Sequence, residues 1–300
     1  MAACARRVWL VLGASSIDCH DESAGYFVTS FDPGSPDVRA VSSNRPDADG
    51  LDDLTQFMGG RVVSVEIAAI ATAGAVIDEV AAMFGPFMVP SARPEIHYVL
   101  DRPGAPERVL IGRPQSYSYK IDDAYQRDVA LQFVAADPVA RDPAGQSAIA
   151  WAGSSGNVAG RRYDLTFDRI YPAGSASPTP ATISTPGDVA VAPLLQLYGP
   201  ITGARVLFKV GATNSGGVGL VASYVIGSGH YVEIDCAQRT ARLDGDPTKS
   251  VLTSIDWNYV SSSGGWPTIP PASTVTMTYS GTSTTSATQV VATWNDGYLT

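Results

Sequence analysis

The sequence predicts a mainly-β protein of two domains, and three observations support this. Of the 300 residues, 45% are hydrophobic and only 16% are charged, with 29 Gly and 21 Pro. Such a composition is typical of short strands joined by frequent turns. Apolar and polar residues also alternate repeatedly along the chain, and the chain is long enough for two domains that each bury a core.

Residues 1–140 are expected to form the first domain, a β-sandwich or split barrel. Within residues 61–70, Val63, Val65 and Ile67 share one face of a strand while Ser64 and Glu66 share the other. The same alternation gives the apolar sets Ile96, Tyr98, Leu100 and Val129, Leu131, Phe133, Ala135. The apolar run after Arg6 and Arg7 is read as a first strand, because it is short for a signal peptide.

One helix is predicted in this domain, near residues 75–85. The apolar residues Val76, Ile77, Val80, Met83 and Phe84 recur at helical spacing, and Gly85-Pro86 follows as a stop signal. A single amphipathic helix of this kind packs its apolar stripe against a sheet.

A loop-rich connection is predicted over residues 141–188. Pro, Gly, Ser and Thr are dense there, with one strand-like stretch at 163–171. Strand patterns resume in the second domain, residues 189–300, where Gly-, Asp- or Pro-bearing turns separate them. This pattern, without a helix between the strands, predicts an antiparallel β-sandwich.

The charge pattern excludes several functions. The formal net charge is -9, most of the excess acid lies in the first half, and no basic stripe is present. Nucleic-acid binding is therefore not expected. No apolar stretch approaches the ~20 residues of a membrane helix, so membrane insertion is not expected either.

The three cysteines, Cys4, Cys19 and Cys236, are widely spaced and form no metal-ligand pattern. We expect no disulfide, no metal and no cofactor. Buried single thiols of this kind suit a protein folded in a reducing cytoplasm.

No catalytic constellation stands out. The three histidines, His20, His97 and His230, are scattered and lie in no nucleophile or metal-ligand spacing. Glu233 and Asp235 share one strand face and are the single carboxylate pair to weigh as a glycosidase dyad. A polar outer face followed by a turn aspartate explains the same pair, and we expect no enzyme.

The second domain resembles the C-terminal part of the siphophage distal tail protein family, which includes phage minor tail proteins. The matching positions are Pro193, Gly199, Asp235, Arg239, Asp244-Gly245 and Trp294. Asp235 would accept backbone N–H groups at a turn, and Asp244-Gly245 would supply a left-handed turn position. The sequence departs from the family at Pro271-Ala272-Ser273, where a glycine turn is usual, so the geometry of that loop is open.

The first domain is similar to the N-terminal part of the same family, so the resemblance covers nearly the whole chain. The matching positions are Arg39, Gly50, Thr55, Gly60-Arg61 and Asp137-Pro138. Each motif is a short segment at a strand end or a turn. The resemblance rests on the order of these motifs across the two domains. Arg61 would aim its guanidinium at a carboxylate, as in an intersubunit contact, or be a solvated rim charge.

The resemblance implies a non-enzymatic virion protein at the tip of a long non-contractile tail. It implies a ring of six subunits that joins the tail tube to the tip or baseplate complex and to receptor-binding proteins, near the tape measure protein. The first domain would make the ring, and the second, a galectin-like sandwich, would face outward. Assembly would take place in the cytoplasm of the bacterial host.

The alternative function is a carbohydrate-binding tail module that contacts the host cell surface. Trp257, Tyr259 and Trp266 are close in sequence, and aromatic rings can stack on sugars. Trp257 is expected in the core by strand phase, which leaves Trp266 as the exposed candidate for a sugar or partner contact.

Overall fold

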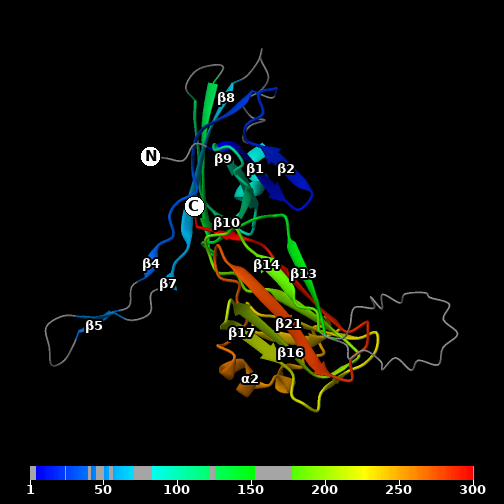
Figure 1. Ribbon diagram of the computed structural model, residues 1–300. Coiled ribbons are helices and arrows are strands. Elements are labelled where there is room, and N and C mark those ends of the chain that lie inside the picture. Colours follow the sequence, from blue (N-terminus) through cyan, green and yellow to red (C-terminus); the bar gives the residue numbers. More distant parts are fainter. Residues whose placement is uncertain are drawn as a thin grey trace, which may run out of the picture. The chain divides into compact units, whose positions relative to one another are not determined.

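The computed structural model describes residues 5–23, 25–39, 42–44, 51–53, 57–70, 83–121, 126–152 and 178–299 (Figure 1). Most described residues lie in antiparallel strands, which confirms the mainly-β prediction. The chain divides into unit 1, Met1–Pro143 with Gly297–Thr300, and unit 2, Ala144–Asp296. Within the described residues, no helix is both long enough and apolar enough to cross a membrane.

Unit 1 is built on one continuous path of seven strands in the order β2-β1-β9-β10-β11-β8-β3. Their bounds are β1 (Ala5–Leu12), β2 (Ser15–Asp18), β3 (Tyr26–Asp32), β8 (Arg61–Ile70), β9 (Glu95–Leu100), β10 (Glu107–Ile121) and β11 (Gln126–Ala135). Two short pairs, β4 (Val38–Arg39) with β7 (Phe57–Met58) and β5 (Ser42–Asn44) with β6 (Leu51–Asp53), lie between β3 and β8 in the chain.

Strand β10 joins the two halves of this path. Its residues up to Ile111 pair with β9, and those from Gly112 onward pair with β11. A side chain at Gly112 would put its Cβ 2.8 Å from both Ile96 Cδ1 and Phe133 Cβ, so only glycine fits where the strand changes partner. Core side chains of unit 1 therefore contact the backbone of β10 at the point where this strand changes partner.

The predicted strand faces are confirmed in unit 1. Val63, Val65, Ile67, Ile96, Tyr98, Val129, Leu131, Phe133 and Ala135 are all buried, together with Val8 and Leu10 of the predicted first strand. Each large apolar side chain buried in this way contributes about 1.5–3 kcal/mol to folding. Most of the helix predicted near residues 75–85 lies outside the described residues. Its end leads into a 3-10 turn, η1 (Gly85–Met88), and buries Phe84 and Phe87.

The C-terminal end of the chain completes unit 1. Strand β23 (Gly297–Tyr298) pairs with β12 (Ala140–Arg141), which in turn pairs with β10. The guanidinium of Arg108 lies 4.4 Å from the ring centroid of Tyr298, and both side chains are buried. The chain thus leaves unit 1 after β12 and returns beside it, with unit 2 inserted between.

Arg61 holds this C-terminal segment. Its side chain is only 1% exposed, so the interpretation of Arg61 as a solvated rim charge is wrong. Its guanidinium donates to the carbonyl oxygens of Leu299 at 3.0 Å and of Gly34 at 3.4 Å, and also to that of Pro138. The sequence could not indicate this role, because the acceptors are main-chain atoms far along the chain.

Unit 2 is a sandwich of two antiparallel sheets. One has the order β13-β22-β15-β19-β20 and the other β14-β21-β16-β17, with β18 beside β16. The strands are β13 (Gln146–Trp151), β14 (Ala181–Ser184), β15 (Leu194–Tyr198), β16 (Ile201–Val210), β17 (Thr213–Gly219), β18 (Val225–Ile226), β19 (Tyr231–Asp235), β20 (Thr240–Leu243), β21 (Thr274–Thr282) and β22 (Gln289–Trp294). Apolar residues from both sheets form its core, including Leu195, Val206, Phe208, Ile234, Met277 and Val290.

Two features of unit 2 differ from the sequence prediction. The ends of the predicted connection, residues 141–188, supply strands β13 and β14, because Ala150 and Ile183 are apolar and fill the core. The stretch at 163–171 lies outside the described residues. The sequence also predicts no helix between the strands of this unit, and this prediction is wrong. After the 3-10 turn η2 (Leu252–Ser254), helix α2 (Trp257–Ser262) begins at an Asp256 cap whose carboxylate accepts from Tyr259 N.

The predicted turn chemistry is confirmed. Asp235 Oδ1 accepts hydrogen bonds from the backbone N–H groups of Ala237 and Gln238. Asp244 and Gly245 have φ values of 54° and 68°, so both adopt the left-handed conformation. The loop that departs from the family keeps a left-handed residue without glycine, because Ala272 has φ 45°.

Candidate functional site

The outward face of strands β2, β1, β9 and β10 in unit 1 combines apolar and charged side chains. We call it the Trp9 face. It consists of Arg7, Trp9, Val11, Asp18, Glu95, His97, Val99, Glu107, Val109 and Ile111. These residues share a face because they alternate with the buried residues of the same strands and pair in register.

The centre of the Trp9 face is a stacked pair of rings from neighbouring strands. The rings of Trp9 and His97 have centroids 5.1 Å apart and an interplanar angle of 23°. His97 Nδ1 lies 2.8 Å from Glu107 Oε1, and Nε2 lies 3.1 Å from Glu95 Oε2. His97 points outward, as predicted, yet its side chain is only 12% exposed because these neighbours enclose it.

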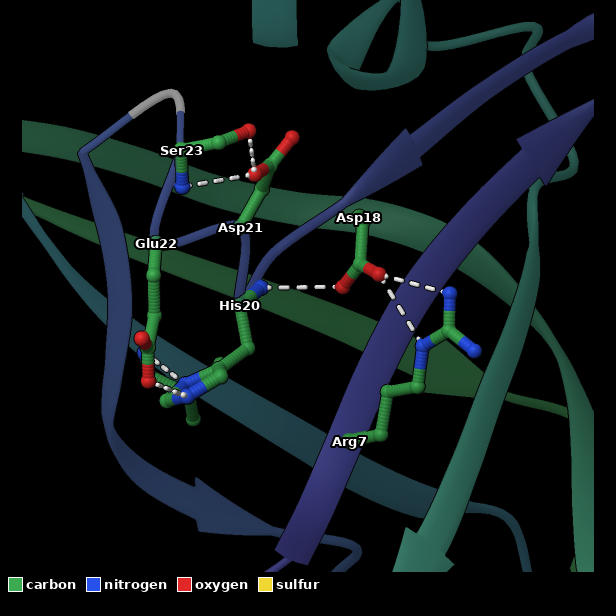
Figure 2. A network of polar contacts seen from close by, with 7 residues as sticks. Arg7, Asp18, His20, Asp21, Glu22 and Ser23 are labelled. Atoms are coloured by element: carbon green, nitrogen blue, oxygen red, sulfur yellow. Dashed lines mark hydrogen bonds and ion pairs between the residues drawn. The ribbon is translucent and has the colours of Figure 1, made fainter.

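A charged pair borders the rings on the side of β2. Arg7 Nε donates to Asp18 Oδ2 at 2.9 Å (Figure 2). The Arg7 guanidinium lies 5.0 Å from the Trp9 ring centroid. Asp18 Oδ1 also accepts from the backbone N–H of His20. Exposed ion pairs contribute little to stability, about 0–1 kcal/mol, so this contact mainly orients the side chains around Trp9.

The segment that follows β2 is held by the same network as it runs to β3. His20 Nδ1 accepts from the backbone N–H of Val28 at 3.3 Å, and its Nε2 lies 3.8 Å from Glu22 Oε1. Asp21 Oδ1 accepts from both the backbone N–H and the hydroxyl of Ser23 (Figure 2). These contacts fix the link between the two ends of the strand path.

The Trp9 face also presents apolar area to solvent. Ile111 is 59% exposed, while Val11, Val99 and Val109 are half-buried around it and the ring pair. An apolar patch with an aromatic ring and a charged margin has the composition of a protein–protein contact. The sequence signal for this patch is an apolar residue at the solvent-facing, polar phase of several strands.

The exposure of Trp257 and Trp266 in unit 2 differs from the sequence prediction. Trp257 begins α2 and is 49% exposed, so its predicted place in the core is wrong. Trp266, the predicted exposed residue, is half-buried and packs against the core. The two rings meet edge to face at 5.9 Å. Tyr259 lies apart from them on α2, with the Arg205 guanidinium 4.8 Å from its ring centroid.

The groups weighed for catalysis are engaged in other contacts. His20, His97 and His230 each lie against carboxylates, the last with Asp244 Oδ2 at 2.9 Å from its Nδ1. The bonds from His230 and from the Tyr231 backbone hold the pKa of Asp244 below its ordinary value. Asp235 accepts a backbone hydrogen bond within a turn, and Glu233 accepts a hydrogen bond from Gln196 Nε2 at 3.3 Å. Among the described residues, no group of three or more His, Cys, Asp or Glu side chains has an arrangement that could hold a metal ion.

Two cysteines, Cys19 and Cys236, are buried free thiols. Burial raises the pKa of both thiols far above the ordinary value, with a smaller contribution from the neighbouring aspartates. A thiol of this kind packs as a small apolar side chain and is a poor nucleophile.

Comparison with known proteins shows the fold. No protein-family model matches the sequence, and no curated protein matches it. The fold is shared with one solved phage protein over nearly its full length, which confirms, at the level of the fold, the resemblance to distal tail proteins. The similar structure that carries this conclusion is the Dit protein of phage SPP1, described as a paradigm of the hub adsorption apparatus in phages that infect Gram-positive bacteria.

The match to SPP1 Dit extends over both chains. It has a TM-score of 0.59 at 12% sequence identity and covers 97% of this chain and 99% of that one. Two structures of the phage P2 baseplate, in its activated conformation with Ca and with Sr, also align over 93% of the chain, at 7% and 8% identity. Their TM-score is 0.42, and no argument rests on them.

Proposed function

We propose that the chain is a structural, non-enzymatic component of the tip of a long non-contractile phage tail. In this proposal it forms a ring of six subunits that joins the tail tube to the tip or baseplate complex and to receptor-binding proteins. The observation that carries it is the fold shared with SPP1 Dit over nearly the full length of both chains. The chain is assembled in the host cytoplasm and resides in the virion tail.

Unit 1 supplies the ring contacts in this proposal. A closed ring is built from heterologous interfaces, so each subunit needs two different surfaces. The Trp9 face is one, because it combines the exposed Ile111 with the stacked rings of Trp9 and His97. The edge of β3 is the other, since β3 ends the strand path among the described residues and an edge strand can pair with a neighbour.

We expect Ile111→Arg to weaken ring assembly at least tenfold. The substitution places a charge at the most exposed apolar side chain of the Trp9 face, where it would be desolvated on contact. Light scattering coupled to size-exclusion chromatography over a dilution series measures the change, with the wild type expected at six chains. Val225→Arg is the matched control, because Val225 is 62% exposed in unit 2. A monomeric wild type, or a ring broken only by the control, contradicts the proposal.

A further inference from the structure

The outward face of the sheet β13-β22-β15-β19-β20 in unit 2 carries planar side chains in two rows. We call it the Tyr231 face and define it by Trp151, Gln196, Tyr198, Tyr231, Glu233 and Arg242. Each of these side chains is half-buried and alternates with core residues of its strand. The sandwich core lies on the other side of the sheet, so this face does not contribute to it.

Aromatic rings form the first row. Tyr198 and Tyr231 are directly paired in register, and their ring centroids lie 5.2 Å apart at an interplanar angle of 32°. Trp151 stands in the same row on β13, opposite Gln289 of β22. Because neighbouring strands lie about 4.8 Å apart, Trp151 is about 10 Å from Tyr198 across the sheet.

Hydrogen-bonding groups form the second row. Gln196, Glu233 and Arg242 are paired in register across β15, β19 and β20. Gln196 Nε2 donates to Glu233 Oε2 at 3.3 Å, and the Tyr198 hydroxyl donates to Gln196 Oε1 at 3.1 Å. These bonds fix the planes of the side chains while using only part of the capacity of an amide and a carboxylate. The row therefore presents oriented donors and acceptors.

A tight turn borders the two rows at Tyr231. A Cβ on Gly245 would lie 3.0 Å from the Tyr231 hydroxyl oxygen and 3.6 Å from Glu233 Oε2. The turn is held by Asp244, whose Oδ1 accepts from the Tyr231 backbone N–H at 3.1 Å. Burial, and then the negative charge of Glu233, raise the pKa of Tyr231, so its hydroxyl stays protonated and can donate. The face is thus bounded on one side by fixed backbone.

We propose that the Tyr231 face binds a neutral saccharide. The apolar faces of sugar rings stack on the aromatic row, and their hydroxyl groups bond to the polar row. Aromatic surface combined with a few oriented polar groups is the usual composition of a small-ligand site. The negative charge of Glu233 balances the single guanidinium of Arg242, so the face has no excess of positive charge to attract an anionic polymer.

This binding does not depend on the ring. It uses unit 2 alone, and it places the saccharide site on a different surface from Trp257 and Trp266, which the sequence indicated. Failure to bind sugar would leave the assembly proposal untouched, and a monomeric chain could still bind.

The test uses the full chain on an array of neutral mono- to hexasaccharides of glucose, galactose, rhamnose and N-acetylglucosamine, followed by calorimetry with the best-bound glycan. We expect Tyr231→Ala to weaken binding at least tenfold, and Glu233→Gln to weaken it severalfold. Tyr231→Phe keeps the ring and should retain most of the affinity. Trp257→Ala is the matched control, because it removes an exposed aromatic ring elsewhere in unit 2. Circular dichroism serves to check that each variant is folded.

Three outcomes would overturn the proposal. The first is an array on which no glycan is bound by the wild type. The second is binding that Trp257→Ala abolishes while Tyr231→Ala leaves it unchanged, which would move the site to α2. The third is a Tyr231→Ala variant that binds glycans normally but no longer incorporates into tails, which would make the occupant of this face a protein.

Discussion

Replacing Arg61 with methionine is expected to lower the free energy of unfolding of unit 1 by about 3 kcal/mol or more. The guanidinium is buried and bonds to carbonyl oxygens from three separate segments, at Gly34, Pro138 and Leu299. Methionine fills much of the same space but leaves these acceptors without a donor. Urea unfolding of the full chain measures the loss.

Arg113→Met is the control for this prediction. Arg113 lies on β10 but is exposed, so its loss should change the free energy of unfolding by less than about 0.5 kcal/mol. Equal stabilities for the Arg61 and Arg113 variants would show that Arg61 does not hold the C-terminal segment.

Separating the two units is expected to affect them very unequally. Residues 144–296 contain every strand of the unit 2 sandwich, and their last residue, Asp296, accepts from the hydroxyl of Thr185 within that unit. This fragment should unfold cooperatively on its own. Residues 1–143 lack β23, so Arg61 and Arg108 lose the backbone and ring that they contact. That fragment should be largely unfolded or aggregated.

A third fragment provides the control. Because Arg141 pairs with Gly297, a short Gly/Ser linker can join residue 143 to residues 297–300. We expect this joined fragment to recover cooperative unfolding, measured by circular dichroism during heating. A fragment 1–143 as stable as the joined one would contradict the role assigned to the returning strand.

The sequence was most informative where a side-chain pattern is local. The alternation in residues 61–70 predicts β8 and its buried face, and the short polar motifs at Asp235 and Asp244-Gly245 predict turns whose hydrogen bonds and backbone angles the structure contains. Each of these depends on neighbours within a few residues. Periodicity and turn chemistry report such contacts directly.

Long-range contacts were missed for the same reason. Arg61 is bonded to residues more than 200 positions away, and nothing near it in the sequence signals a buried cation. Trp257 has the phase of a strand residue after Ile255, but the Asp256 cap starts a helix there and turns the ring toward solvent. The Tyr231 face depends on register between strands, which the sequence of single strands does not contain.

Electron cryomicroscopy of the purified virion can show whether this chain forms a ring at the tail tip. We expect density for six copies at the end of the tail tube, with the Trp9 face of each unit 1 in contact with the neighbouring subunit. Density for the chain elsewhere in the virion, or its absence from the particle, would contradict the proposed ring.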